Sequence, residues 1–368
     1  MQTPTVSVLL PAYNAGRYID QAIESILNQT FRDLELIVID DGSRDDTLAR
    51  IQAHAGRDSR VRVVTRENRG LIATLNEGIA LARADLIARM DADDIAYPER
   101  LERQVKTFRE TPGLGLCGTA VDTLFKDRIF RGKPVRLLTE GSPGILSIFY
   151  TMFFHPTLMI DRRVAGDQLM YDPSYPHAED FDLIRRLAER FQIAYLPEPL
   201  LAYRQHEGSV TVVHRRVMRQ THMRIVRENL TAYGFTGDLE ALSAFADEIT
   251  PETVRRAGAV MADVRAQFRQ RDPAQVASYE LGWTGLFFLM HAMFIDASET
   301  SLLRDFLNMT DGWGQLRRRE QMFLKLTHAN SGLAIGGLKA SYALQAFVSQ
   351  FGSIPLSDFD RVLSSRGI

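Results

Sequence analysis

The chain has 368 residues, of which 45% are hydrophobic, a formal net charge of -2 and a single cysteine, Cys117. This length fits one large domain or two ordinary ones, and the hydrophobic fraction supports a sizeable core, which excludes bulk disorder. The charge gives no general electrostatic case for nucleic-acid binding, and one thiol excludes an intramolecular disulfide. We expect Cys117 to be a small buried hydrophobic residue.

The first hundred residues alternate strand and helix patterns. Apolar runs predict strands at residues 6–10, 34–39, 61–64 and 86–90. Apolar residues at helical spacing predict helices at residues 18–27 and 70–81. A polar helix is expected at residues 47–54, and Pro98 stands where a helix through residue 108 would start. Because crossovers of this length join parallel strands, the pattern predicts right-handed βαβ units and a mostly parallel α/β sheet covered by helices on both faces.

The pattern is mixed beyond residue 113 and becomes helical near residue 209. Short strands are predicted at 114–121, 157–160 and 200–204, a polar hairpin or loop at 126–136, and a helix at 178–191. We therefore predict two regions, 1–212 and a helical 213–368. The apolar stretch 281–295 is too short to cross a bilayer and is expected to be a buried helix, with shallow membrane docking as the alternative.

The two ends of the chain carry simple expectations. Residues 1–5 show no basic region followed by an apolar run, so no signal peptide is expected. Residues 356–368 are expected to be a loose tail.

Acidic residues follow two of the predicted strands. Asp91-Ala92-Asp93 comes after the fourth strand, and Asp40-Asp41 after the second. Ligands of such sheets bind at the carboxyl ends of strands, and clustered carboxylates favour Mg²⁺ or Mn²⁺; a solvated acidic loop is the alternative. Asp41 is expected to accept hydrogen bonds from a nucleobase, while Ser43 or Asp45 caps the next helix.

Other polar side chains have both a functional and a structural interpretation. Tyr13 follows the first strand and either stacks on a nucleobase or packs under its turn. Glu179-Asp180 begins a helix, where the dipole favours acids, but it also suits a general base. His206 is either a metal ligand or a hydrogen-bonded structural residue, and His155 has the same ambiguity.

The motifs taken together resemble family-2 glycosyltransferases with the GT-A fold. The chain has no Gly-x-Gly-x-x-Gly after the first strand, no Gly-Lys-Ser/Thr phosphate loop and no Gly-x-Ser-x-Gly elbow. The resemblance covers about the first 210 residues. Its matching stretches are residues 6–14 (VSVLLPAYN), 25–31 (SILNQTF), 35–47 (ELIVIDDGSRDDT), 68–80 (NRGLIATLNEGIA), 91–101 (DADDIAYPERL), 155–156 (HP), 179–180 (ED) and 203–206 (YRQH).

This resemblance implies a nucleotide-sugar site. Asp41 would contact uracil, Tyr13 would help to hold the base, and Pro11 would line the pocket. Asp91 would lie near the ribose and Asp93 would bind the divalent cation, Mn²⁺ or Mg²⁺.

The resemblance also implies an inverting transfer. Asp180 would be the catalytic base, His206 would complete the metal site, and Asp94 would support the acids. The chain has no Gln-x-x-Arg-Trp segment and no membrane-spanning pattern, so a single-addition enzyme is expected, rather than a processive synthase. The expected donor is a UDP-sugar, and the expected acceptor is a glycan or lipid-linked hydroxyl in surface polysaccharide or lipopolysaccharide biosynthesis.

Two other functions also fit the sequence. A nucleotidyltransferase on a similar sheet would release pyrophosphate, and a non-catalytic scaffold would sense nucleotide without turnover. The helical region would bind the acceptor, form an oligomer or contact a membrane. Arg215, Arg216 and Arg219 either attract anionic lipid or, as we favour, form a solvated helix face. We expect a cytoplasmic protein, with peripheral contact to the inner face of the membrane as an alternative.

Overall fold

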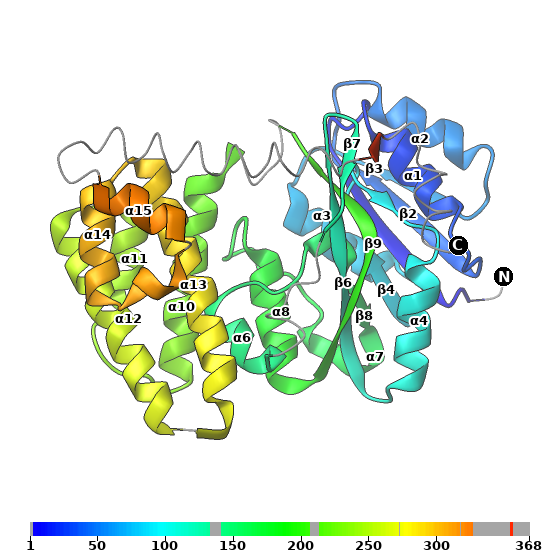
Figure 1. Cartoon of the computed structure of the whole chain (residues 1–368). Helices are drawn as coiled ribbons and strands as arrows, with labels where there is room; N and C mark the ends of the chain where they lie inside the picture. The colour runs from blue at the N-terminus through cyan, green and yellow to red at the C-terminus, as the bar shows by residue number, and fades with distance from the viewer. Residues whose placement is uncertain are drawn as a thin grey trace. The chain divides into compact units, whose positions relative to one another are not determined.

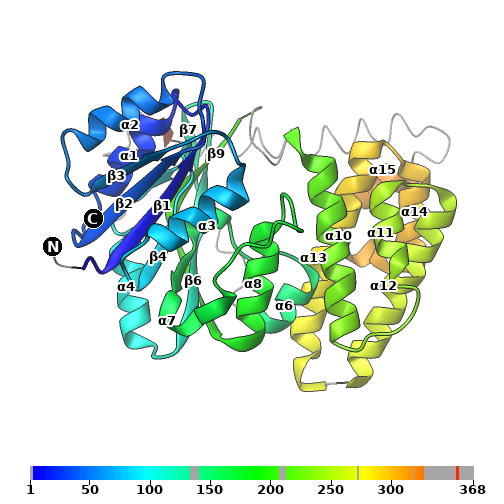
Figure 2. The same ribbon diagram turned by 180° about the vertical axis from the view of Figure 1, so that it is seen from behind.

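The computed structural model describes residues 3–132, 141–206, 213–271, 273–316, 318–326 and 354–355. These residues form two compact units, which we describe separately (Figures 1 and 2). The first unit comprises the described residues within 1–139, 151–213 and 353–368, and the second those within 140–150 and 214–352. The main division therefore follows residue 213, and the described segment 141–150 belongs with the helices of the second unit.

The first unit is built on a single mixed sheet. Its strands are β1 (Val6–Ala12), β2 (Leu34–Asp40), β3 (Val61–Thr65), β4 (Leu86–Arg89), β5 (Ile95–Ala96), β6 (Leu114–Phe125), β7 (Arg128–Phe130), β8 (Met159–Asp161), β9 (Gln192–Gln205) and β10 (Ile354–Pro355). The order is β10-β7-β6-β8-β4-β1-β2-β3, and β9 pairs with both β5 and β6. The first four strands are parallel, whereas β8 runs antiparallel to β4 and to β6.

Helices cover both faces of this sheet. They are α1 (Ile19–Leu27), α2 (Thr47–Ala55), α3 (Leu71–Leu81), α4 (Arg100–Glu110), α7 (Arg162–Ala165) and α8 (Glu179–Arg190), with short 3-10 turns η1 (His155–Thr157) and η2 (Gly166–Gln168). One core cluster joins α1, α2 and α4 to alternate residues of β1, such as Val8. On the other face, a Cβ added at Gly78 of α3 would lie 3.2 Å from Leu9. All seven residues of β2 are buried, as expected for a strand covered on both sides.

The predicted α/β class, with flanking helices and a helical region after it, is confirmed. All four early strands and helices form within a few residues of their expected bounds. The sheet is mixed because β8, which stands between β4 and β6, runs antiparallel to both. The polar segment after β6 is a hairpin whose turn, Lys126-Asp127, has positive φ at both residues, as type I′ turns require; residues 133–136 of that prediction lie outside the described residues.

Cys117 lies on β6 and is fully buried. Burial raises the pKa of its thiol to about 12, so the group is an unreactive thiol at neutral pH. The expectation of a small buried hydrophobic residue is confirmed.

The second unit is helical. Its elements are α6 (Pro143–Phe149), α10 (Arg215–Ala232), α11 (Glu240–Asp247), α12 (Pro251–Arg271), η3 (Pro273–Gln275), α13 (Val276–Ala297), α14 (Thr300–Met309), η4 (Gly312–Gln315) and α15 (Arg318–Leu326). Its core is aromatic: Phe245, Phe294 and Phe306 pack with ring centroids 5.1 to 6.4 Å apart. Helix α6 is joined to α10 by Asn229, whose amide donates to the carbonyls of Ser147 and Ile148.

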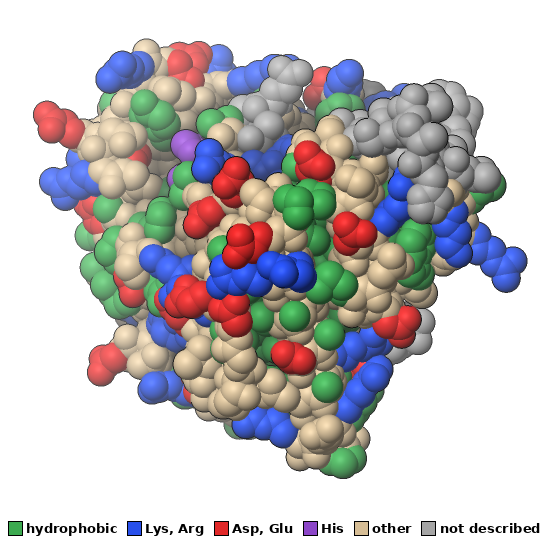
Figure 3. All heavy atoms as spheres, turned by 90° about the vertical axis from the view of Figure 1, so that its left-hand side faces the viewer, with side chains coloured by type: hydrophobic (Ala, Val, Ile, Leu, Met, Phe, Trp, Pro, Cys, Tyr) green, Lys and Arg blue, Asp and Glu red, His purple; other side chains and the backbone are tan. Residues whose placement is uncertain are grey.

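The apolar stretch 281–295 lies within α13, and most of its side chains are buried, as expected. Among the residues that the structure describes, no helix is long and apolar enough to cross a membrane. Arg215 and Arg219 of α10 both pair with Asp296 of α13, at 3.0 and 2.6 Å. Acidic and basic side chains intermingle across the face of this unit that Figure 3 shows. Arg215 and Arg219 therefore share one carboxylate partner within this unit.

Candidate active site

Three acidic or aromatic turns leave the sheet at one edge. Leu9 of β1 stands between Ile37 of β2 and Arg89 of β4, and both pairings are parallel. The turns that follow these strands carry Tyr13, Asp41 and Asp91, respectively. Parallel pairing in this register places all three turns beyond the carboxyl ends of adjacent strands, where α/β sheets bind ligands.

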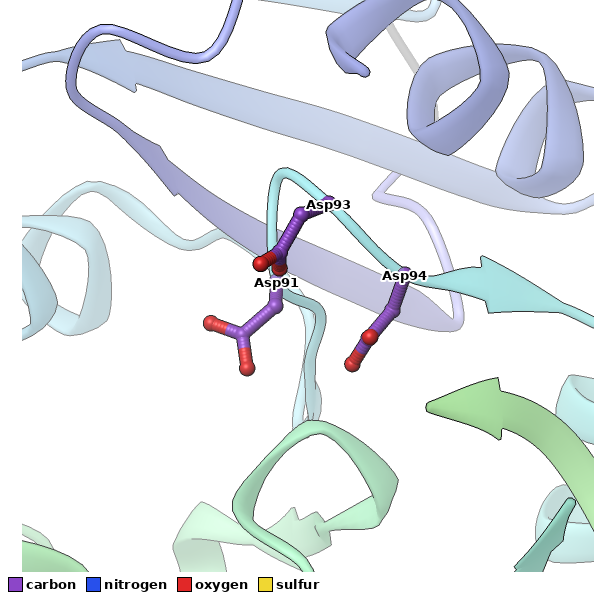
Figure 4. Close-up of side chains that lie close together, drawn as sticks. All are labelled: Asp91, Asp93 and Asp94. Carbon is purple, nitrogen blue, oxygen red and sulfur yellow. The ribbon is translucent and has the colours of Figure 1, made fainter. Parts of the chain in front are cut away.

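The turn after β4 holds a cluster of three carboxylates, Asp91, Asp93 and Asp94 (Figure 4). One oxygen from each lies within 4.8 Å of the others. Asp94 is almost fully buried, and within the described part of the chain its Oδ2 has no hydrogen-bond partner. Burial, reinforced by the charges of Asp93 and Asp91, raises the pKa of the Asp94 carboxyl well above its usual range. A buried, unpartnered oxygen beside two more carboxylates fits a hard divalent cation, which prefers oxygen ligands.

The end of β9 is fastened to this turn. The backbone N–H of Arg204 donates to Asp94 Oδ1 at 2.7 Å, and its Nε donates to the Asp93 carbonyl at 2.6 Å. His206 Nε2 lies 2.8 Å from Asp93 Oδ2. The ring of Tyr18 lies against both the Arg204 guanidinium and the His206 ring, at 4.5 and 5.2 Å. His206 is thus brought to Asp93, as a shared metal site would need.

Two buried arginines, Arg89 and Arg100, are connected to the carboxylate turn, and neither was identified from the sequence. Arg89 pairs with Asp91, and Arg100 donates to the Arg89 carbonyl at 2.7 Å. Burial raises the pKa of Asp91, and the Arg89 charge opposes that rise. Burial, together with the neighbouring Arg89, lowers the pKa of Arg100 to about 9. The available signal was Arg89 itself, a cation within the apolar run of β4.

The Asp41 carboxylate is engaged by the loop before α3. It accepts hydrogen bonds from the backbone N–H groups of Arg69 (2.8 Å) and Gly70 (2.9 Å), and it pairs with Arg66. Gly42 makes this close approach possible: its φ is +74°, and an added Cβ would lie 2.8 Å from the Asn68 nitrogen. Asp41 is 4% exposed, and both of its carboxylate oxygens are engaged by this loop, so its side chain organises the loop.

The turn after β1 is held by the turn after β2. The backbone N–H of Asn14 donates to the Ser43 hydroxyl at 2.9 Å, while Asp45 accepts from the backbone N–H of Thr47 at 3.1 Å. Of the two expected capping residues, Asp45 is the one that bonds the start of α2. Tyr13 is 48% exposed, so its ring is available for stacking. Pro11, two residues before it in the sequence, is partly buried.

Glu179 and Asp180 form the first turn of α8. Asp180 is partly exposed and accepts a hydrogen bond from the Phe181 N–H at 2.8 Å. Burial raises the pKa of Asp180 to about 6, and burial with the adjacent Asp180 charge raises that of Glu179 to about 7. The charges of Arg89 and Asp91 act on both carboxyls, so the start of α8 lies within electrostatic range of the carboxylate cluster. A partly exposed carboxyl with such a pKa suits proton transfer near neutral pH.

The loop before α8 is anchored from two other elements. The Asn76 side chain of α3 bonds both backbone groups of Tyr171, at 2.9 and 2.8 Å. The Tyr171 hydroxyl lies 2.7 Å from His155 Nε2. Burial lowers the pKa of His155 well below its ordinary value, so its ring is neutral and forms a structural hydrogen bond. Sequence reasoning left His155 open and did not identify Asn76 or Tyr171.

The structure thus brings Asp91, Asp93 and His206 together and places Asp180 within electrostatic range of Asp91. Asp41, Tyr13 and Pro11 lie on neighbouring strands or turns at the same edge. The arrangement combines a cation-binding set of oxygens with a carboxyl of raised pKa.

Comparison with known proteins agrees with this geometry. The sequence model described as Glycosyl transferase family 2 matches residues 7–158. An uncharacterized glycosyltransferase of Haemophilus influenzae is 32% identical over 240 residues, which cover 62% of this chain and 74% of that protein. The O-antigen biosynthesis glycosyltransferase WbnJ of Escherichia coli is 33% identical over 208 residues, or 55% of this chain and 81% of that protein.

A solved structure shares the fold. Residues 1–349 of TarS from S. aureus, in complex with UDP, superpose with a TM-score of 0.51 at 18% identity, covering 77% of this chain and 90% of that one. At this identity the likeness concerns the fold alone.

Proposed function

The chain belongs to glycosyltransferase family 2, and we propose that it transfers a sugar, with inversion, from a UDP-sugar to a hydroxyl of a glycan or lipid-linked acceptor. The observation that carries the proposal is the cluster of three carboxylates with the partly exposed Asp180, whose pKa is about 6, within electrostatic range of Asp91. The name of the Escherichia coli relative supports a role in surface polysaccharide or lipopolysaccharide synthesis. We also assign the protein to the cytoplasm, with any membrane contact peripheral.

In this proposal the edge of the sheet binds the donor. Asp41 and the loop it organises receive the uracil, Tyr13 stacks on the base, Pro11 lines the pocket, and Asp91 reaches the ribose. Asp93 and His206, with the unpartnered Asp94 oxygen, would hold Mn²⁺ or Mg²⁺. Such an ion, when bound, would stabilise the negative charge of the departing diphosphate.

Asp180 acts on the acceptor. Its carboxylate accepts the proton of an acceptor hydroxyl, and the oxygen forms a bond to the anomeric carbon from the face opposite the diphosphate. The bond between that carbon and the donor phosphate oxygen breaks, and the nucleoside diphosphate takes the bonding electrons. The partly buried site strengthens the electrostatic effect of each charged group on this step.

The helical second unit is proposed to serve acceptor binding, oligomerisation or peripheral membrane contact. Arg215 and Arg219 are already paired with Asp296, which favours the first two roles over attraction to anionic lipid.

The test begins with a thermal-shift screen of UDP-, GDP- and dTDP-sugars in Mn²⁺, because a ligand that binds the native state raises its melting temperature. Transfer or donor hydrolysis is then measured with and without EDTA. We expect a UDP-sugar to give the largest shift, EDTA to stop turnover, and Asp93→Asn and Asp180→Asn each to reduce it by about 10²-fold or more.

Two results would contradict the proposal. Near wild-type turnover by Asp180→Asn would remove Asp180 as the base. Binding of UDP and Mn²⁺ without turnover on any donor would favour a nucleotide sensor, and release of pyrophosphate from a nucleoside triphosphate would favour a nucleotidyltransferase.

A further inference from the structure

Two aromatic rings of the first unit form an exposed pair. Phe154, which precedes η1, is 42% exposed, although phenylalanine is usually buried. Its ring centroid lies 5.0 Å from that of Tyr203 on β9, with the planes 53° apart. Tyr203 is itself half-buried and packs against the core cluster beneath α1 and α4. Tyr203 is therefore supported by the core, while the Phe154 ring is exposed to solvent.

Each ring of this pair adjoins, in sequence, a residue that is bonded to one part of the candidate active site. Phe154 adjoins His155, which is hydrogen-bonded to Tyr171 in the loop before the Asp180 helix. Tyr203 adjoins Arg204, which donates hydrogen bonds to Asp93 and Asp94. Phe154 is thus connected to the loop that precedes Asp180, and Tyr203 is connected to the carboxylate cluster.

The surroundings select the kind of ligand. An aromatic face attracts C–H groups because its π-cloud is electron-rich, and a pyranose ring presents C–H groups on its face and hydroxyls around its rim. Polar residues adjoin the two rings in sequence: His155 follows Phe154, and Arg204, which bonds Asp93 and Asp94, follows Tyr203. A hydrocarbon tail would need a continuous apolar surface, whereas a sugar can use an aromatic face and a polar border together.

We propose that Phe154 and Tyr203 form an acceptor subsite, on which a pyranose ring of a glycan acceptor stacks while its hydroxyl faces Asp180. The inference rests on the proposed function and extends it by naming the acceptor class as a carbohydrate. Phe154 supplies the exposed face, and Tyr203 holds that ring in place.

The test uses the full chain with UDP and Mn²⁺ present. Saturation-transfer NMR is recorded with methyl pyranosides of glucose, galactose, N-acetylglucosamine, N-acetylgalactosamine and rhamnose. At least one is expected to receive saturation at its ring C–H groups. Phe154→Ala should reduce that signal at least fivefold, and Phe154→Trp should restore it, which a purely structural role would not predict.

A matched control is Phe125→Ala, which removes an aromatic side chain of similar exposure, 39%, at the end of β6; it should leave the signal unchanged. Calorimetry with UDP and Mn²⁺ on the same samples separates the two hypotheses. If nucleotide binds normally but no pyranoside gives a signal, or Phe154→Ala keeps it, the subsite is refuted alone. If neither nucleotide binding nor donor turnover is found, the proposed function fails, and the subsite with it.

Discussion

Replacing Asp180 by asparagine should reduce transfer by about 10²-fold or more and yet stabilise the folded chain at neutral pH. The carboxyl is partly buried, and burial is the main reason why its pKa rises from 3.8 to about 6. Asparagine is nearly the same size and keeps an oxygen that can accept the Phe181 N–H. The variant therefore removes a charge that is costly to bury but leaves the local hydrogen bond in place.

The sign and size of the effect follow from this shift. A folded-state pKa above the unfolded value means that the folded chain binds the proton more tightly, so Asp180 lowers stability as pH rises from about 4 to 6. At about 1.4 kcal/mol per pKa unit the full shift corresponds to about 3 kcal/mol. Partial exposure and the neighbouring Glu179 reduce this, and we expect Asp180→Asn to gain about 1–2 kcal/mol above pH 6 and little below pH 4.

The assay is chemical denaturation followed by circular dichroism between pH 4 and 8, in EDTA. Hydrogen exchange of the α8 peptide assigns the change to the first unit. Asp182→Asn is the matched control on the same helix: Asp182 is 1% exposed and pairs with Arg185 and Arg186 at 2.9 and 2.8 Å. Its loss should cost about 2–4 kcal/mol. A loss of stability in Asp180→Asn at pH 7, or a gain that does not change with pH, would refute the reasoning.

Three other predictions concern the same unit. The transfer rate should increase as pH rises through about 6, because Asp180 must lose its proton to act as a base; a rising limb below pH 5 would contradict this assignment. Gly42→Ala should lower the free energy of unfolding by about 1–3 kcal/mol and weaken UDP binding measured by calorimetry, since φ is +74° and the Asn68 nitrogen lies in the way. Asn76→Leu should cost about 2–4 kcal/mol in a denaturation experiment by leaving both Tyr171 backbone groups unpaired, and Asn76→Asp, which keeps one bond, should cost less.

Much of the first unit could be predicted from local patterns. The spacing of apolar residues predicts strand β2 and helix α1, because each type of element repeats its side-chain direction every few residues. Since parallel strands end at one edge, the acids after β2 and β4 could also be expected on the same side of the sheet. The alternation of segments was therefore sufficient for the fold class and for the general place of the site.

Other features escaped prediction because they join distant parts of the chain. The two-residue strand β5 exists only through its pairing with β9, and it is too short to leave a pattern of its own. Asn76 bonds a backbone 95 residues away, and no local feature of α3 indicates this partner. Residues 141–150 likewise show nothing that assigns them to the second unit.

By itself, the sequence determined which residue types stand after which strands, and so the chemical character of the site: carboxylates, an aromatic ring and a histidine. Only the tertiary structure decided how those groups behave. The unpartnered Asp94 oxygen, the buried cations of Arg89 and Arg100, and the raised pKa of Asp180 all depend on exclusion from water by segments far apart in the chain. Solvation energy is set by everything that surrounds a charge, and that environment exists only once the chain has folded.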